Sequence, residues 1–108
     1  MSSIRQVSGF PETFPQGTTE EIQYVFHFDK MLQDIGVPTT PIDCKLYNLS
    51  TDADVSADKL SGSASLTDYE FTSPLVSGLE KDVVYRLVAE VTVGTQTFSA
   101  YKDLRGEL

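Results

Sequence analysis

The chain contains no tryptophan, one cysteine and one histidine in 108 residues. A single thiol, Cys44, cannot form a disulfide within the chain, and this composition suits a reducing compartment. Basic side chains are also scarce, because 8 Lys and Arg face 16 Asp and Glu, for a formal net charge of −8. Such a chain repels nucleic-acid phosphates and anionic lipids, so we expect neither nucleic acid nor membrane as a partner.

Long apolar runs are missing as well. No segment approaches the roughly 18 consecutive apolar residues of a membrane-spanning helix, and the N-terminal residues lack the apolar core of a signal peptide. Hydrophobic residues still make up 40% of the chain, which is enough for one folded domain of this length. We expect an extended N-terminal arm over residues 1–19 and a single domain over residues 20–108.

The apolar residues that are present favour β-strands. They alternate with polar residues along 22–28, 42–46, 83–93 and 96–101, a period typical of strands with one buried face. Gly94-Thr95 joins the last two segments and predicts a type II′ hairpin turn. The residues predicted to form the core are Tyr24, Phe26, Phe28, Leu79, Tyr85, Leu87 and Phe98.

The remaining segments are less regular. Residues 29–36 predict one or two helical turns, and residues 48–68 predict a loop with a turn near residues 57–60. Residues 69–76 predict a weak strand at a sheet edge, because Pro74 cannot donate a ladder hydrogen bond. Several short strands with turn-rich connections indicate an all-β sandwich of about seven antiparallel strands.

The segment from Leu79 to Val91 resembles the tyrosine corner of fibronectin type III domains and related sandwiches. In that motif a strand Tyr follows a Leu by six residues and its hydroxyl bonds back to upstream backbone; Tyr85 stands at this spacing from Leu79. Lys81 and Asp82 replace the usual Pro and Gly, and the Trp and Cys pair of true immunoglobulin domains are absent. The resemblance therefore implies an immunoglobulin-like β-sandwich and no narrower subfamily.

Most of the chain is similar, in the order of its elements, to small immunoglobulin-like proteins of tailed bacteriophages and prophages. The shared order is Pro15-Gln16-Gly17, a strand ending Phe26-His27-Phe28-Asp29, Met31-Leu32, an Ile-led strand, Gly62, the Leu79–Tyr85 corner and a hairpin at Val93-Gly94. The resemblance implies a virion component, such as a capsid decoration, a head–tail connector or a tail-associated protein, assembled in the bacterial host cytoplasm. Its implied partners are other virion proteins, with self-association as a further option. It supplies no site motif.

Candidate partner contacts come from the strand pattern and from the arm. Val84 and Val88 lie on the outer side of the predicted strand 83–93, and an exposed apolar strip on a sheet indicates a covering segment or a partner. Phe10 and Phe14 in the arm could supply the cover. Alternatively, the arm reaches a neighbour and adds a strand to its sheet. A simple covering of loop residues is the third option.

No residue set predicts a catalytic, cofactor or metal site. His27 points outward near Asp29, but no nucleophile-elbow sequence accompanies it. Cys44 occupies an inward strand position, where a free Cys packs as a small hydrophobe. The acidic loop Asp52–Asp58 partly matches a calcium loop but lacks its Gly and its final Glu, so cation binding there stays open.

We thus predict a non-enzymatic structural protein of a phage or prophage particle that acts through protein–protein contacts. The alternative is a bacterial adhesion or carbohydrate-binding module, which this architecture also hosts. That alternative predicts an exposed aromatic platform, for which Tyr47, Tyr69 and Tyr101 are the candidates.

Overall fold

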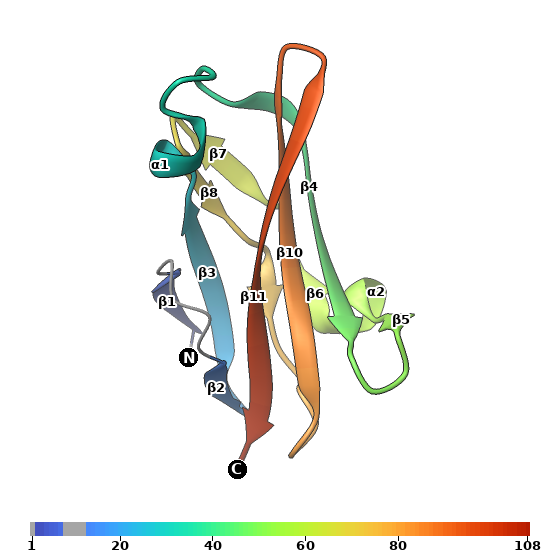
Figure 1. Ribbon diagram of the computed structural model, residues 1–108. Helices are drawn as coiled ribbons and strands as arrows, with labels where there is room; N and C mark the ends of the chain where they lie inside the picture. The colour runs from blue at the N-terminus through green and yellow to red at the C-terminus, as the bar shows by residue number, and fades with distance from the viewer. Residues whose placement is uncertain (1, 8–12) are drawn as a thin grey trace.

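The computed structural model describes residues 2–7 and 13–108, which form two β-sheets packed against each other as a sandwich (Figure 1). Sheet A contains β1 (Ser2–Val7), β3 (Glu21–His27), β6 (Leu60–Ser61), β7 (Ser65–Thr67), β8 (Glu70–Thr72) and β9 (Leu75–Val76). Sheet B contains β2 (Phe14–Gly17), β4 (Thr39–Asn48), β5 (Ala53–Asp54), β10 (Val84–Val93) and β11 (Gln96–Glu107). Two four-residue helices, α1 (Asp29–Leu32) and α2 (Ser56–Lys59), lie in the connections. Neither helix in this part of the chain has the length that crossing a bilayer requires.

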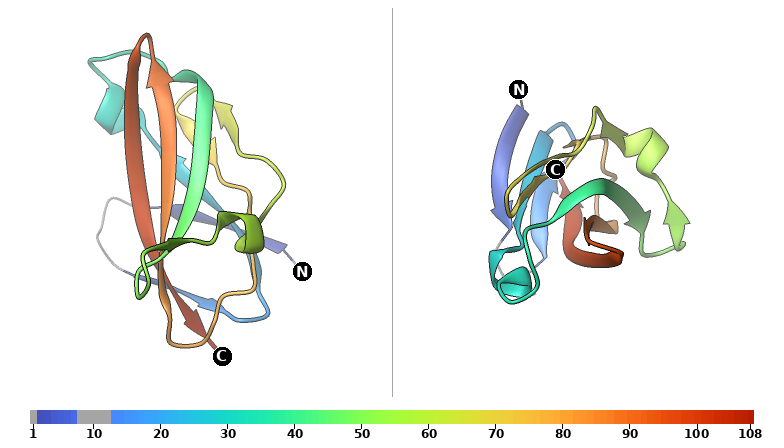
Figure 2. Two further views of the ribbon diagram at one scale, coloured as in Figure 1. Left: turned by 90° about the vertical axis from the view of Figure 1, so that its right-hand side faces the viewer. Right: turned by 90° about the horizontal axis from the view of Figure 1, so that it is seen from above.

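Sheet B is built around the predicted hairpin. Its order is β2-β11-β10-β4-β5, and β10 pairs with β11 in one unbroken antiparallel register from Val84↔Arg105 to Val93↔Gln96. Gly94 adopts a φ of +63°, the positive value that the first position of the turn requires, so the predicted hairpin is confirmed. The strands β4, β10 and β11 run side by side as one layer in the left view of Figure 2.

Sheet A is centred on β3, which has neighbours on both sides. β8 and β9 pair with one side of β3 in antiparallel fashion, and β1 pairs with the other side. The pairings of β1 with β3 and of β2 with β11 are parallel, so the prediction of purely antiparallel strands is wrong for these two. The chain leaves sheet A after β1, adds β2 to sheet B and returns as β3, and such a crossover connection permits parallel pairing.

Two segment predictions need correction. Residues 48–68 are not only loop, because they contain β5, β6 and β7 besides the predicted turn, which is α2. Residues 69–76 form two strands in the interior of sheet A rather than an edge strand. Pro74 lies in the break between these two strands. Here Ser73 takes over the hydrogen bonds to β3: the Ser73 N–H donates to the carbonyl of Tyr24 (2.9 Å), and the Ser73 hydroxyl accepts from the N–H of Tyr24 (2.9 Å).

The core lies between the two sheets and confirms the predicted set. Tyr24, Phe26, Phe28, Leu79, Tyr85 and Leu87 are buried, and Phe98 is half-buried and packs against them. The predicted helical segment 29–36 places the side chain of Leu32 in the core, whereas the apolar side chains of Met31 and Ile35 are exposed.

A buried glutamine links the two sheets. Gln16 on β2 is fully buried; its Oε1 accepts from the Tyr24 hydroxyl (2.7 Å) and its Nε2 donates to the carbonyls of Val76 (2.8 Å) and Glu20 (3.1 Å). The four groups satisfy one another, as buried polar groups must. β2, β3 and β9 are therefore fixed to one another by polar as well as apolar contacts.

The tyrosine corner has the geometry that its resemblance implies. The hydroxyl of buried Tyr85 accepts a hydrogen bond from the backbone N–H of Glu80 (3.1 Å), directly after buried Leu79. This bond ties the start of β10 to the connection that leads into it. The same connection contacts the end of β11, because the N–H of Asp82 donates to the carbonyl of Gly106 (2.9 Å).

Candidate interaction surface on sheet B

The outer face of sheet B follows from the alternation along β10. Tyr85, Leu87, Ala89 and Val91 point into the core, so the residues between them point outward. The register then places Tyr101 of β11 and Lys45 of β4 on either side of Val88, and Tyr47 of β4 beside Arg86. We call this set the outer face; it consists of Lys45, Tyr47, Val84, Arg86, Val88 and Tyr101.

Arg86 is held in place at the centre of the outer face. Its Nε and Nη2 donate to the two carboxylate oxygens of Asp103 (2.8 and 3.1 Å), which lies directly opposite on β11. The hydrogen bonds that the guanidinium donates to the Asp103 carboxylate stabilise its charged form and raise the pKa of Arg86. The same guanidinium lies 4.2 Å from the ring centroid of Tyr101, a cation–π geometry. A bidentate pair and a stacked ring restrict the rotamers of these side chains, so the surface is ordered before any partner binds.

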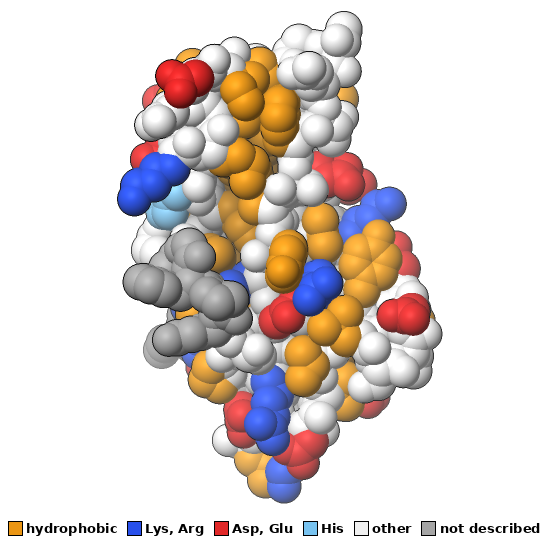
Figure 3. Space-filling model, viewed as in Figure 1, with side chains coloured by type: hydrophobic (Ala, Val, Ile, Leu, Met, Phe, Trp, Pro, Cys, Tyr) orange, Lys and Arg blue, Asp and Glu red, His pale blue; other side chains and the backbone are white. Residues whose placement is uncertain are grey.

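Apolar area remains accessible around this cluster. Tyr101 is 58% exposed, and Val84 and Val88 are partly exposed. Figure 3 shows hydrophobic side chains over β4, β10 and β11, interleaved with charged ones. Exposed apolar area mixed with an ordered Arg and Tyr is typical of protein interfaces, where aromatic residues and Arg are enriched.

Of the four predicted partner contacts, the three that the structure describes do not all lie on one surface. Val84 and Val88 share the outer face on either side of Arg86, but Phe14 packs inward with its ring stacked on Tyr24 (centroids 6.3 Å apart). The Nζ of Lys102 lies 4.3 Å from the centre of the Phe14 ring, on the side of the sheet opposite Tyr101. Phe10 lies outside the described residues.

The three candidate tyrosines divide between two places. Tyr47 and Tyr101 lie on the outer face, separated by β10, while Tyr69 lies at the turn before β8 in sheet A. Tyr69 borders a hollow of about 400 Å³ in this region. The other residues that line this hollow are His27, Asp29, Thr67, Asp68 and Glu70. The three rings therefore do not form one platform.

His27 and the acidic loop have local partners. His27 Nε2 lies 2.6 Å from Gln6 Oε1, and Nδ1 lies 3.9 Å from the Glu70 carboxylate. In the loop, Asp54 Oδ1 accepts from the hydroxyl (2.6 Å) and the N–H (2.9 Å) of Ser56, and these bonds lower the pKa of Asp54. Within residues 2–7 and 13–108, no three His, Cys, Asp or Glu side chains are grouped closely enough to hold a metal ion.

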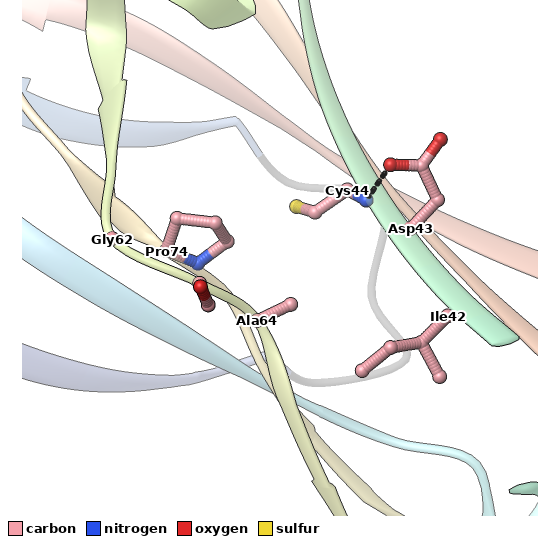
Figure 4. A pocket seen from close by; sticks show the side chains of 7 residues that line it. Ile42, Asp43, Cys44, Gly62, Ala64 and Pro74 are labelled. Carbon is pink, nitrogen blue, oxygen red and sulfur yellow. Dashed lines mark hydrogen bonds between the residues drawn. The ribbon is translucent and has the colours of Figure 1, made fainter. Parts of the chain in front are cut away.

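Cys44 borders a pocket of about 300 Å³ between β4 and the β6–β7 and β8–β9 connections of sheet A (Figure 4). Ile42, Gly62, Ala64 and Pro74 also line it. The Asp43 carboxylate accepts the backbone N–H of Cys44 (2.9 Å). Burial and, to a smaller extent, the negative charge of Asp43 together raise the pKa of the Cys44 thiol to about 12. The protonated thiol is a poor nucleophile, so we expect Cys44 to react slowly at neutral pH.

Sequence reasoning placed Val84 and Val88 outward but missed the residues that order the surface. Arg86 and Asp103 are 17 positions apart, and only the hairpin register brings them together. Extending the predicted turn at Gly94-Thr95 along both strands would have paired them, so the signal was present.

Searches of protein-family models, of curated proteins and of solved structures found no match to this chain.

Proposed function

We propose that this chain is a non-enzymatic structural protein of a tailed phage or prophage particle, and that it acts through protein–protein contacts made by the outer face of sheet B. The observation that carries the proposal is the ordered cluster of Arg86 and Tyr101 beside the exposed parts of Val84 and Val88. The occupant we assign to this face is a neighbouring protein subunit of the particle. Under this proposal, the particle assembles in the cytoplasm of the bacterial host.

The fold supports an immunoglobulin-like interpretation. Two packed sheets and the Tyr85–Glu80 bond agree with that class. The parallel pairings of β1 and β2 depart from the antiparallel sheets of a simple immunoglobulin sandwich. The core of the domain therefore supports the class more strongly than its N-terminal strands do.

The net charge of the chain indicates what kind of surface the partner presents. A formal net charge of −8 favours association with a surface that carries basic residues around an apolar centre. Glu90 and Asp43 lie opposite each other next to the outer face, beyond Val88 and Lys45, and supply local acidic groups for such a surface. We therefore expect the partner subunit to present Lys or Arg at the rim of its contact.

The first test is proteomics of purified particles after prophage induction in the strain that encodes the chain. Presence at a fixed stoichiometry supports the proposal, and the copy number separates a capsid decoration from a neck or tail protein. Particles that assemble completely without the chain would overturn it.

A pair of charge-matched variants tests the assigned face. Val88→Glu places a carboxylate at the centre of the outer face, whereas Thr67→Glu places one at an exposed position of sheet A. We expect Val88→Glu to lower incorporation into particles by about tenfold or more, since moving a carboxylate from water into an apolar contact costs several kcal/mol. Thr67→Glu should incorporate normally. Equal incorporation of both variants would exclude the outer face as the contact.

The adhesion or carbohydrate-binding alternative draws on the exposed ring of Tyr101. The Arg86 guanidinium covers one side of this ring at 4.2 Å, which leaves one side for a sugar. A glycan array with the wild-type chain and Tyr101→Ala separates the two functions. Specific binding that Tyr101→Ala abolishes would favour the alternative.

A further inference from the structure

Strand β1 occupies an edge that another copy of itself could occupy. It pairs with β3 over six residues, from Ser2↔Glu21 to Val7↔Phe26, on the side of β3 opposite β8 and β9. A strand in that position saturates a row of backbone N–H and C=O groups that would otherwise be exposed. This edge of β3 therefore binds a strand, and in this structure the bound strand is β1.

The contacts that hold β1 are mostly backbone and polar. Ile4 is 62% exposed, and Gln6 is also exposed; Val7 alone in β1 packs against the core cluster. Arg5 donates to the carbonyl of Pro15 and lies 4.0 Å from the Glu20 carboxylate. Parallel pairing is also slightly less stable per residue than antiparallel pairing. β1 is thus attached mainly by a ladder and a few polar contacts.

The domain beneath β1 is complete without it. Every fully buried residue of the core cluster lies between Ile22 and Leu104, outside β1. The inward residues of β3, namely Ile22, Tyr24 and Phe26, pack against core residues that β1 does not supply. Loss of β1 would expose the edge of β3 and remove the contact of Val7 with the core cluster, but it would remove no fully buried residue of that cluster.

We propose that two copies of this chain exchange β1, so that Ser2–Val7 of one copy pairs with β3 of the other. The occupant is defined by the observed register: the same six residue pairs form in trans, together with the contact between Arg5 and the neighbouring copy's Glu20. Exchange of an identical terminal element is a low-cost route to a dimer. The exchange is a property of the chain alone, so its test needs no particle and its outcome is separate from the proposed particle role.

Cysteine pairing detects the exchange directly. All variants carry Cys44→Ser, which removes the native thiol. Ile4→Cys and Gln23→Cys are made in separate chains, because these two residues are partners in the register. One chain is ¹⁵N-labelled, the two are mixed and equilibrated from micromolar to millimolar concentration, and disulfides are formed with a mild oxidant. Mass spectrometry then counts mixed dimers. The off-register control mixes Ile4→Cys with Ser99→Cys, an exposed position on sheet B.

Exchange predicts several-fold more mixed dimer for the Ile4–Gln23 pair than for the control, with the yield rising with concentration. In the single chain that carries both Ile4→Cys and Gln23→Cys, it predicts disulfides between chains as well as within them. Mixed dimers no more abundant than the control, with the double variant closing only within single chains at every concentration, would overturn the proposal.

A second measurement uses the native thiol background. The double variant Ile4→Pro/Arg5→Pro removes ladder donors from β1, whereas Ile4→Ser removes the exposed apolar side chain and keeps the N–H. Light scattering should show dimer for the wild-type chain and Ile4→Ser and monomer for the proline variant, with unchanged circular dichroism in all three. A dimer that is lost in Ile4→Ser but kept in the proline variant would show that the exposed Ile4 side chain, and not the exchange of β1, causes the association.

Discussion

The Tyr24 hydroxyl donates a hydrogen bond to Oε1 of Gln16 over 2.7 Å, and this bond crosses from one sheet to the other. Because Gln16 also donates to two backbone carbonyls, a single amide satisfies three groups in the interior. Buried groups of this kind are costly to leave unpaired, and the network therefore specifies how β2 docks on the sandwich.

Gln16→Leu should destabilise the chain by about 2–4 kcal/mol, because the Tyr24 hydroxyl and the Val76 carbonyl lose their partner. Urea unfolding measures the change. Gln96→Leu, an exposed residue beside the hairpin turn, is the matched control and should stay within about 0.5 kcal/mol of the wild type. In the double variant with Tyr24→Phe, the two losses should be less than additive; full additivity would show that the bond carries no coupling.

Stability should fall at alkaline pH because of Tyr24. Burial raises its pKa from 10.0 to about 12, so the unfolded chain loses this proton first. The contribution is fully present below pH 10 and is lost as pH rises from 10 to about 12, for a total of about 3 kcal/mol. Unfolding curves across that range should show a shallower decline for Tyr24→Phe than for the wild type. Tyr101→Phe, which removes an exposed phenol, should decline like the wild type.

Cys44 should resist alkylation in the folded chain. Its pKa of about 12 leaves a very small thiolate fraction at pH 8, and the thiolate is the reactive form. We expect iodoacetamide to react at least about a hundredfold more slowly with the folded chain than with the chain in urea, as mass spectrometry would record. Comparable rates in the two states would show that the thiol is neither buried nor protonated as described.

Gly106 should not tolerate a side chain. A Cβ at this position would lie 1.9 Å from the carbonyl oxygen of Glu80, which is backbone and has little room to move. Gly106→Ala should therefore cost about 1–3 kcal/mol or more. The loss should be accompanied by faster amide exchange at Glu80, whose N–H donates to Tyr85. Ser99→Ala on the same strand serves as the control, and a variant Gly106→Ala of wild-type stability would contradict the close approach.

The parts of the fold that follow local rules were predictable from the sequence. The alternation along β10 and the turn at Gly94-Thr95 determine their own hairpin, because period and turn type are encoded in adjacent residues. The bond between the Tyr85 hydroxyl and upstream backbone was instead implied by the resemblance of the Leu79–Tyr85 segment to a tyrosine corner.

The parts that depend on long-range pairing were not predictable. Gln16 follows a proline in a polar segment, and nothing local indicates that it is buried between sheets. β5, β6 and β9 have two residues each, which is too short for any period to appear. The parallel direction of β1 depends on the crossover through sheet B, a property of the whole topology. The candidate surface was predicted only in part: its apolar residues follow from alternation, whereas the Arg86–Asp103 pair emerges only when the predicted hairpin register is extended along both strands.

The parallel pairing of β2 with β11 has a mechanical consequence. Phe14 pairs with Leu104 and Gly17 with Glu107, so an early strand and the final strand run in the same direction along one edge. Tension applied at the start of β2 and at the end of β11 acts along this ladder in opposite directions. The hydrogen bonds between the two strands then share the load together, instead of opening one after another as they would under a pull at right angles to the strands. Under such a load, the sandwich would resist stretching along the direction of these two strands.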